Sequence, residues 1–480
     1  MFFSKINLLI KTDLTKIYFL FLSTISFILY GKGLLSKTDF KETIKLAWPV
    51  SLGQLGHVTL GVVDSVMVGQ VGTDSLAASS LVNGLFFLVI VLGIGMTMAT
   101  TPLVSIAKGE NNFSRCSKIF KQSIIVNFVF SVLLTFIVYY LSFLIPFLNQ
   151  PERVAVLAES YLKILSYSII PFLLFQTYRQ YVEGLSITKP PMYIAIAANI
   201  INFFGNWLLI YGNLGFNAMG LDGAGYSTLF TRLFMAITII IYVKKAKKLK
   251  QFSRVKNFIF FDLKIIKKII AIGLPSGLMY ALEVGAFAFS AIMVGWLGSI
   301  QLAAHQIAIS LASISYMIIL GISAAGTIRV GNAMGEKNKS NIRKAGFTAV
   351  LLGVIFMTLS GITFILLNKF FPSLYVTNNE VIEVASNLLI IAALFQISDG
   401  IQAIGLGILR GLTDVKVPLV ITFIAYWVFA IPFGYILGFK LRFGVIGIWS
   451  ALLIGLTIAA ILFFVRFNKK TKQIIFVNND

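Results

Sequence analysis

Long apolar segments recur along the whole chain of 480 residues and leave only short polar stretches between them. A run of about 20 apolar residues is long enough to cross the hydrocarbon core of a bilayer as a helix. Hydrophobic residues make up 58% of the chain and charged residues only 12%, whereas soluble domains carry about 25% charged residues. The pattern therefore predicts an all-α polytopic membrane protein. Its twelve expected membrane helices are 44–69, 76–107, 117–147, 154–183, 190–212, 222–243, 265–295, 301–333, 344–368, 379–410, 417–439 and 445–467.

Lysine and arginine gather in alternate loops between these segments. The net charge of +22 would suggest nucleic-acid binding in a soluble protein, but membrane proteins concentrate positive charge on their cytoplasmic side. The basic loops and tail comprise residues 108–121, 244–268, 337–344 and 469–472. The intervening loops are nearly free of basic residues, with Lys440 and Arg442 as the exception. We expect a multi-pass membrane protein, in contact with lipid, with both termini in the cytoplasm and no nucleic-acid partner.

The chain also repeats itself. The sequence MVGQVGTDSLAA at Met67 returns as MVGWLGSIQLAA at Met293, and Pro49 matches Pro275 at the same offset of 226 residues. Further along, EGLSITKPPM matches RGLTDVKVPL. Two copies of a six-helix unit have the same orientation, so a pseudo-two-fold axis along the membrane normal should relate them, with a cavity between them.

This repeat divides the chain into two expected lobes. The N-lobe spans 41–243 and the C-lobe 265–468, joined by a basic cytoplasmic linker, 244–264, and followed by a cytoplasmic tail, 469–480. Residues 1–40 lie outside the repeat. We expect this extension to be interfacial or weakly ordered, and a signal-like segment or an over-extended first helix are the alternatives.

Three isolated acids lie inside the apolar segments: Asp64, Glu283 and Asp399. A carboxylate at membrane depth costs about 2.5 kcal/mol or more unless it binds an ion, a proton or a partner. The repeat does not copy any of the three, since the equivalent positions hold serine, histidine and phenylalanine. A purely structural role would more easily be shared between the halves. We therefore expect each acid to bind a cation, a proton or substrate.

Amide side chains accompany these acids. Asn199, Asn202 and Asn206 share one face of the fifth helix, and their oxygens together with Asp64 would suit a hard cation such as Na⁺ or a protonated acid. The alternative is that the asparagines only join helices. In the tenth helix, Gln396 and Gln402 lie three residues either side of Asp399 and form a polar face with it.

Other charged residues have spacings typical of structural pairs. Glu159 with Lys163, and Arg179 with Glu183, are four residues apart, a spacing that permits a local ion pair. Arg232 falls near the middle of the sixth helix, where it is either a counter-ion for Asp64 or part of the inner vestibule.

The two histidines, His57 and His305, are more typical of packing residues than of proton relays. The chain has no phosphate-binding loop, no HExxH or CxxC motif and no convincing nucleophile triad. We therefore expect a transporter driven by an ion gradient, not an enzyme, with no cofactor besides a coupling Na⁺ or H⁺.

Several short motifs together resemble the multidrug and toxic compound extrusion (MATE) family, nearest its NorM-type bacterial branch. They are GVVDSVMVGQVG, NFFGNWLLIYG, GLPSGLMYALE, QLAAHQIA and SDGIQAIGLGILRG, in an order and spacing that cover about residues 40–468. The N-terminal extension departs from the family pattern, and His57 is not one of its marks.

The resemblance implies the MATE fold with two lobes, in the bacterial inner membrane, and the export of cationic, often aromatic compounds by alternating access in exchange for Na⁺ or H⁺. We expect a monomer, and the sequence does not decide the oligomeric state. It implies a first-lobe cation or proton site at Asp64, Asn202 and Asn206, extended by Thr228, and a second-lobe site at Glu283 and Asp399. The candidates for lining the substrate cavity are Gln396, Gln402, Asn199, Thr228, Arg232 and His57.

Three other classes compete with this interpretation. A lipid-linked oligosaccharide or polysaccharide flippase of the same superfamily would need a basic cavity, whereas the cavity charges expected here are mainly acidic. A major-facilitator transporter would carry a charged motif where this chain has AKGENNFSRCSK. A receptor or scaffold would not need asymmetric buried acids. The sequence decides neither Na⁺ against H⁺ nor the substrate.

Overall fold

The computed structural model describes residues 36–252 and 261–476, and within them twelve helical spans are long and apolar enough to cross a membrane. The expected all-α fold and the number of membrane helices are therefore confirmed. Most of the expected N-terminal extension, residues 1–35, lies outside the described residues, as does the middle of the expected linker, 253–260. The first helix begins at Lys37 rather than residue 44, because Ser36 and Asp39 form a capping box there.

The N-lobe contains six spans, two of which are broken into two helices. Its elements are α2 (Lys37–Gly69), α3 (Thr73–Thr97), α4 (Thr100–Gly109), α5 (Phe113–Ser142), η1 (Ile145–Leu148), α6 (Glu152–Tyr167), α7 (Ile169–Gly184), α8 (Lys189–Leu209), η2 (Asn213–Gly215), α9 (Gly220–Lys245) and η3 (Lys247–Phe252).

The C-lobe repeats this arrangement with longer uninterrupted helices. Its elements are α10 (Leu263–Gly295), α11 (Ser299–Gly335), α12 (Lys339–Leu366), α13 (Phe370–Ser373), α14 (Asn379–Gly411), α15 (Lys416–Phe423), η4 (Ile424–Ala430), α16 (Ile431–Tyr435), η5 (Ile436–Lys440) and α17 (Gly444–Gln473). The elements α15 to η5 form one span, in which η4 and η5 are π-helical.

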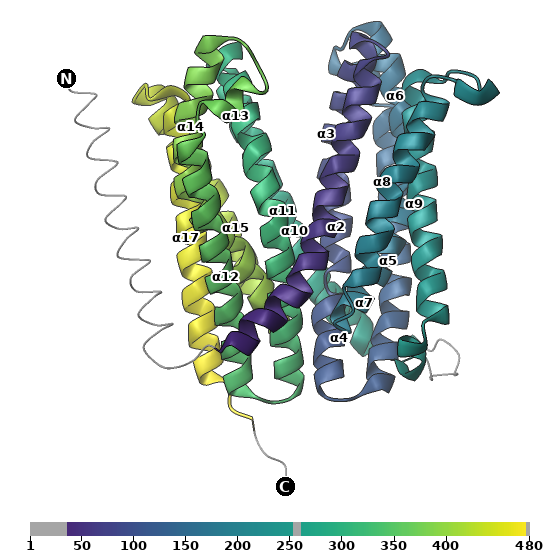
Figure 1. Cartoon of the computed structure of the whole chain (residues 1–480), viewed down its shortest axis with the longest axis vertical. Coiled ribbons are helices and arrows are strands. Elements are labelled where there is room, and N and C mark those ends of the chain that lie inside the picture. Colours follow the sequence, from purple (N-terminus) through teal and green to yellow (C-terminus); the bar gives the residue numbers. More distant parts are fainter. Residues whose placement is uncertain (1–35, 253–260, 477–480) are drawn as a thin grey trace.

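The two lobes form a V (Figure 1). They meet at the end where α2 starts and α17 finishes, and they separate toward the end that carries α6 and α13. The buried apolar residues follow this shape. One cluster contains residues of both lobes, such as Leu103 and Ile319, whereas two further clusters belong to the C-lobe and the N-lobe alone. Packing is therefore continuous between the lobes at the closed end only.

Each lobe begins with a helix that starts against the other lobe. The first turns of α2 pack on the C-lobe, where Arg329 of α11 binds Asp39 at 2.7 Å, and Figure 1 shows α2 crossing from there to the N-lobe. The equivalent helix α10 starts beside α5 and packs along α3. Both crossing helices contain an internal proline, Pro49 or Pro275, which removes a backbone hydrogen bond and bends them.

The crossings bring backbones into contact at glycines. A Cβ atom at Gly95 of α3 would lie 2.2 Å from Cα of Gly277 in α10. At the pseudo-equivalent crossing, a Cβ at Gly321 of α11 would lie 2.0 Å from Oγ of Ser51 in α2. Both α3 and α11 therefore need glycine where the lobes cross.

The N-lobe differs from the C-lobe in two broken helices. The break between α3 and α4 falls at Met98, four residues before Pro102. The break between α6 and α7 falls at Ser168, three residues before Pro171. In a continuous helix, each proline ring would clash with the carbonyl group four residues earlier. The repeat replaces these prolines with isoleucine and serine in the C-lobe, where α11 and α14 run without interruption.

Candidate functional site

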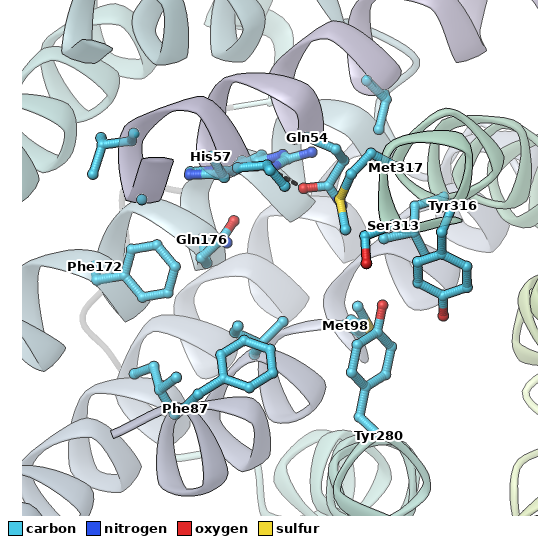
Figure 2. A pocket seen from close by; sticks show the side chains of 18 of the residues that line it. Gln54, His57, Phe87, Met98, Phe172, Gln176, Tyr280, Ser313, Tyr316 and Met317 are labelled. Atoms are coloured by element: carbon cyan, nitrogen blue, oxygen red, sulfur yellow. Dashed lines mark hydrogen bonds between the residues drawn. The ribbon is translucent and has the colours of Figure 1, made fainter. Parts of the chain in front are cut away.

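A cavity of about 760 Å³ lies between the lobes and is lined by helices of both. Figure 2 shows its wall: Gln54 and His57 of α2 and Phe172 and Gln176 of α7 stand on one side, and Tyr280 of α10 and Tyr316 of α11 on another. Phe87 and Met98 add apolar surface from the N-lobe. A largely apolar and aromatic wall with a few polar groups is typical of a small-molecule site.

Asp64 of α2 lies on the cavity wall with its carboxylate among neutral partners. Asn206 Nδ2 donates to Asp64 Oδ1 at 2.5 Å, and Thr228 Oγ1 of α9 donates to Asp64 Oδ2 at 3.4 Å. Asn202, one turn before Asn206 on α8, accepts a hydrogen bond from it through Oδ1 at 3.4 Å. Asp64 is 8% exposed, so this charge is held among amide and hydroxyl groups rather than in bulk solvent.

The expected asparagine face is only partly directed at Asp64. Asn199 turns back along its own helix and donates to the carbonyl of Ala195 at 2.8 Å. The side-chain oxygens Oδ1 of Asn199 and Asn206 are both buried without a hydrogen-bond partner in the described structure, but of these two residues only Asn206 contacts Asp64. The pocket thus offers oxygen atoms from Asp64, Asn202, Asn206 and Thr228, which are the ligand types that Na⁺ prefers.

Glu283 and Asp399 lie together in the interior of the C-lobe. Tyr316 donates to Glu283 Oε1 at 3.3 Å, and Gln402 donates to Oε2 at 3.5 Å. The two carboxylates are 6% and 7% exposed and close enough to interact electrostatically. Neither belongs to the lining of the large cavity, so this pair is set back behind Tyr316 and Tyr280.

Two C-lobe groups near this pair have different roles. Gln396 donates to Ser315 Oγ at 3.2 Å and joins α14 to α11 instead of contacting a carboxylate. Tyr426, in the π-helical segment η4, is fully buried and its hydroxyl has no hydrogen-bond partner among the described residues. Tyr426 could not be identified from the sequence, because a single aromatic residue in an apolar helix is not distinctive.

Arg232 lines the cavity but forms no ion pair with Asp64 within 4 Å in the described structure. Its Nη1 donates to Ser168 Oγ at the α6–α7 break at 2.7 Å, and its guanidinium lies over the rings of Phe86 and Phe172 at 5.1 and 4.8 Å. His57 also lines the cavity, where Nε2 lies 3.4 Å from Nη1 of Arg179. The other histidine, His305, accepts a hydrogen bond from Trp449 in the C-lobe core.

The expected local ion pairs are present, and one of them lies in the cavity. Glu159 and Lys163 are 2.5 Å apart and partly exposed, whereas Arg179 and Glu183 are 2.7 Å apart and almost fully buried. Arg179 and Glu183 are both part of the cavity lining, together with Gln54, which Arg179 contacts at 3.5 Å. Sequence spacing revealed the pair but not that it faces the cavity.

The charges on the cavity wall correct the expectation of a mainly acidic cavity. The lining contains the acids Asp64 and Glu183 and the arginines Arg179, Arg232 and Arg410. The expectation was wrong because Glu283 and Asp399 are set back from the cavity and because Arg410, at the end of α14, lines it. In the described residues, no cluster of three His, Cys, Asp or Glu side chains could hold a metal ion.

Known proteins share both the sequence and the fold of this chain. The family model described as MatE matches residues 49–208 and 275–436, which are the two repeats. The Probable multidrug resistance protein NorM of Mesorhizobium japonicum is 32% identical over 91% of this chain and 95% of its own length. The Multidrug resistance protein MdtK of Photorhabdus laumondii is 33% identical, with 91% and 96% covered. The crystal structure of the eukaryotic MATE transporter AtDTX14 superposes with a TM-score of 0.82 at 19% identity, over 91% of this chain and 98% of that one.

Proposed function

This chain belongs to the MatE family of membrane transporters, and from that premise we propose that it exports cationic, often aromatic compounds in exchange for Na⁺ or H⁺. The observation that carries the proposal is the position of Asp64. It is a carboxylate with neutral partners on the wall of a large aromatic cavity between two lobes. Such a group attracts an organic cation, an inorganic cation or a proton, and only one of them at a time.

Competition at Asp64 would provide the coupling. A cation or proton bound among Asp64, Asn202, Asn206 and Thr228 neutralises the carboxylate and weakens its attraction for a cationic substrate. Export then requires that the ion and the substrate favour opposite states of the transporter, because a ligand with equal affinity for both states shifts nothing.

Glu283 and Asp399 form the second coupling site in this proposal. Two carboxylates close together in an apolar bundle repel each other unless a cation or a proton lies between them. Tyr316 connects the two sites, because it donates to Glu283 and also lines the cavity. A change of ion occupancy at Glu283 would therefore alter the cavity wall directly.

The V shape supports alternating access by rocking of the two lobes. If the start of α2 and the end of α17 lie on the cytoplasmic side, as we propose, the lobes separate toward the outside (Figure 1). The close glycine contacts at Gly95 and Gly321 lie where the lobes cross and are suitable pivots. We propose a monomer in the inner membrane, with lipid around its apolar faces.

One observation favours a second candidate, a lipid-linked oligosaccharide or polysaccharide flippase. The three arginines in the cavity lining would suit phosphate groups. Two of them are already bound to other side chains, Arg179 to Glu183 and Arg232 to Ser168, which supports drug export over phosphate binding.

The deciding experiment is efflux of a fluorescent cationic dye from vesicles or proteoliposomes that contain the full chain, with Na⁺ varied and a protonophore then added. Efflux that rises with Na⁺ and survives the protonophore establishes Na⁺ coupling. Efflux indifferent to Na⁺ and collapsed by the protonophore establishes H⁺ coupling. The absence of efflux for every cation tested would reject drug export and favour the flippase.

A further inference from the structure

Arg410 is a buried cation that has no ion-pair partner among residues 36–252 and 261–476. It is the second-last residue of α14, it is 9% exposed, and it lines the cavity between the lobes. Its Nε is buried with no acceptor, and no ion pair joins its guanidinium to another described residue. Tyr280 and Tyr316 share this cavity wall with Arg410, and their hydroxyl groups carry no formal charge that could neutralise it.

The repeat explains why this arginine is unpaired. Gly411 matches Gly184, so Arg410 occupies the position that Glu183 holds in the N-lobe. Glu183 is neutralised by Arg179, four residues earlier on the same helix, at 2.7 Å. The residue four positions before Arg410 is Leu406. The C-lobe therefore retains a charge at this position but lacks the neighbour that would neutralise it.

The other cavity arginines are already engaged. Arg179 is bound by Glu183, and Arg232 donates to Ser168 and lies over two phenylalanine rings. Arg410 is thus the one arginine in the described cavity lining that forms neither an ion pair nor a hydrogen bond with another described side chain. A buried guanidinium without an acceptor is costly, and an anionic ligand that enters the cavity would satisfy it.

We propose that Arg410 binds the acidic group of export substrates that carry a carboxylate as well as a positive charge. The proposal rests on the proposed export function and adds to it the residue that holds the acidic group of dipolar substrates. The planar guanidinium can donate two parallel hydrogen bonds to a carboxylate, while Asp64 on the N-lobe wall attracts the positive end. The aromatic residues of the same cavity, such as Phe172 and Tyr280, suit a ring system.

The test uses a matched pair of dyes. Tetramethylrhodamine methyl ester is a cation, and in the corresponding free acid a carboxylate replaces the methyl ester group. Binding of each dye to the purified full-length protein is measured by fluorescence anisotropy, and efflux of each is measured in proteoliposomes. Arg410→Gln should weaken binding of the acid about tenfold or more and change binding of the ester by less than about twofold, since hydrogen bonds to charged groups are worth about tenfold each. Arg410→Lys should restore part of the loss, because it keeps the charge but not the fork.

Arg343→Gln is the matched control. Arg343 is bound by Asn468 and Thr471 on α17, outside the cavity lining, so both dyes should bind that variant as they bind the wild type. Retained ester binding by Arg410→Gln shows that this variant is folded.

Equal loss of both dyes in Arg410→Gln, or no loss of the acid, would overturn the assignment. A wild-type protein that binds and exports the ester but not the acid would overturn it as well and leave the export function standing. A wild-type protein that exports neither dye would reject the export function and this substrate class together.

Discussion

The two lobes share a scaffold and differ in where they place their acids. In the N-lobe, Asp64 faces the cavity among neutral partners. In the C-lobe, Glu283 and Asp399 are paired behind the cavity wall. Two N-lobe spans are also broken, at Met98 and Ser168, whereas the equivalent C-lobe helices α11 and α14 are continuous. The repeat therefore preserves the packing of the helices, whereas the polar sites of the two lobes have diverged. In the proposed mechanism, a substrate in the cavity contacts Asp64 directly and is connected to Glu283 through Tyr316.

The largest expected effect is the loss of dye efflux when an acid of either site is neutralised, and binding of the dye should distinguish the two sites. Asp64→Asn and Asp399→Asn should each reduce coupled dye efflux to background, because each removes a charge that the coupling ion needs. Only Asp64→Asn should also weaken binding of a cationic dye, since Asp399 does not line the cavity. Anisotropy binding and vesicle efflux measure the two effects. Wild-type efflux from well-expressed Asp399→Asn would remove the C-lobe pair from the mechanism.

The pseudo-equivalent charges Glu183 and Arg410 should differ in stability. Glu183→Gln leaves Arg179 buried without its counter-ion and should destabilise the protein by about 3–5 kcal/mol. Arg410→Gln strands no partner and should be neutral or stabilising. Thermal unfolding in detergent compares the variants, with Glu159→Gln in the partly exposed pair as a control expected to change stability by less than about 1 kcal/mol. Equal losses for Glu183→Gln and Arg410→Gln would show that Arg410 has a partner within the protein.

The two crossings between lobes should respond differently to added side chains. Gly95→Ala and Gly321→Ala should each cost about 1–3 kcal/mol, because the new methyl group meets the other lobe. Ser51→Gly should restore part of the Gly321→Ala loss, since Oγ of Ser51 is the nearest atom there. No second substitution of that kind exists for Gly95, whose nearest neighbour is the backbone of Gly277. Rescue is read from the midpoint of thermal unfolding, and its absence would place the clash at the α2 backbone.

The smallest expected effect tests the limits of the N-lobe site. Asn199→Ala should change ion-dependent efflux by less than about twofold. The Asn199 side chain donates to the backbone of its own helix, and no hydrogen bond joins it to Asp64 in the described structure. Asn206→Ala removes the closest donor to Asp64 and should reduce efflux clearly more. Similar losses in both variants would place Asn199 in the cation site.

The sequence predicted what periodicity, repeats and isolated charges can reveal. Twelve apolar segments led to the twelve spans, and the asparagine spacing identified Asn202 and Asn206 as neighbours of Asp64. It did not reveal which way Asn199 turns, since one helical face can be satisfied by its own backbone. The prediction of a mainly acidic cavity from the sequence was wrong. Whether Arg179, Arg410 or Asp399 lines the cavity depends on how the lobes pack, and the pattern within a single helix does not reveal that packing.

The crossing of α2 and α10 gives the halves of this molecule the character of a domain-swapped pair. Each half starts its fold on the surface of the other, through Asp39 with Arg329 on one side and the beginning of α10 beside α5 on the other. In a half expressed alone, the first helix would lack the other half on which it packs. The surface that normally binds the first helix of the other half would be exposed. The two halves synthesised as separate chains should therefore assemble with each other, and the ancestor of such a protein would have worked as a dimer of identical six-helix subunits.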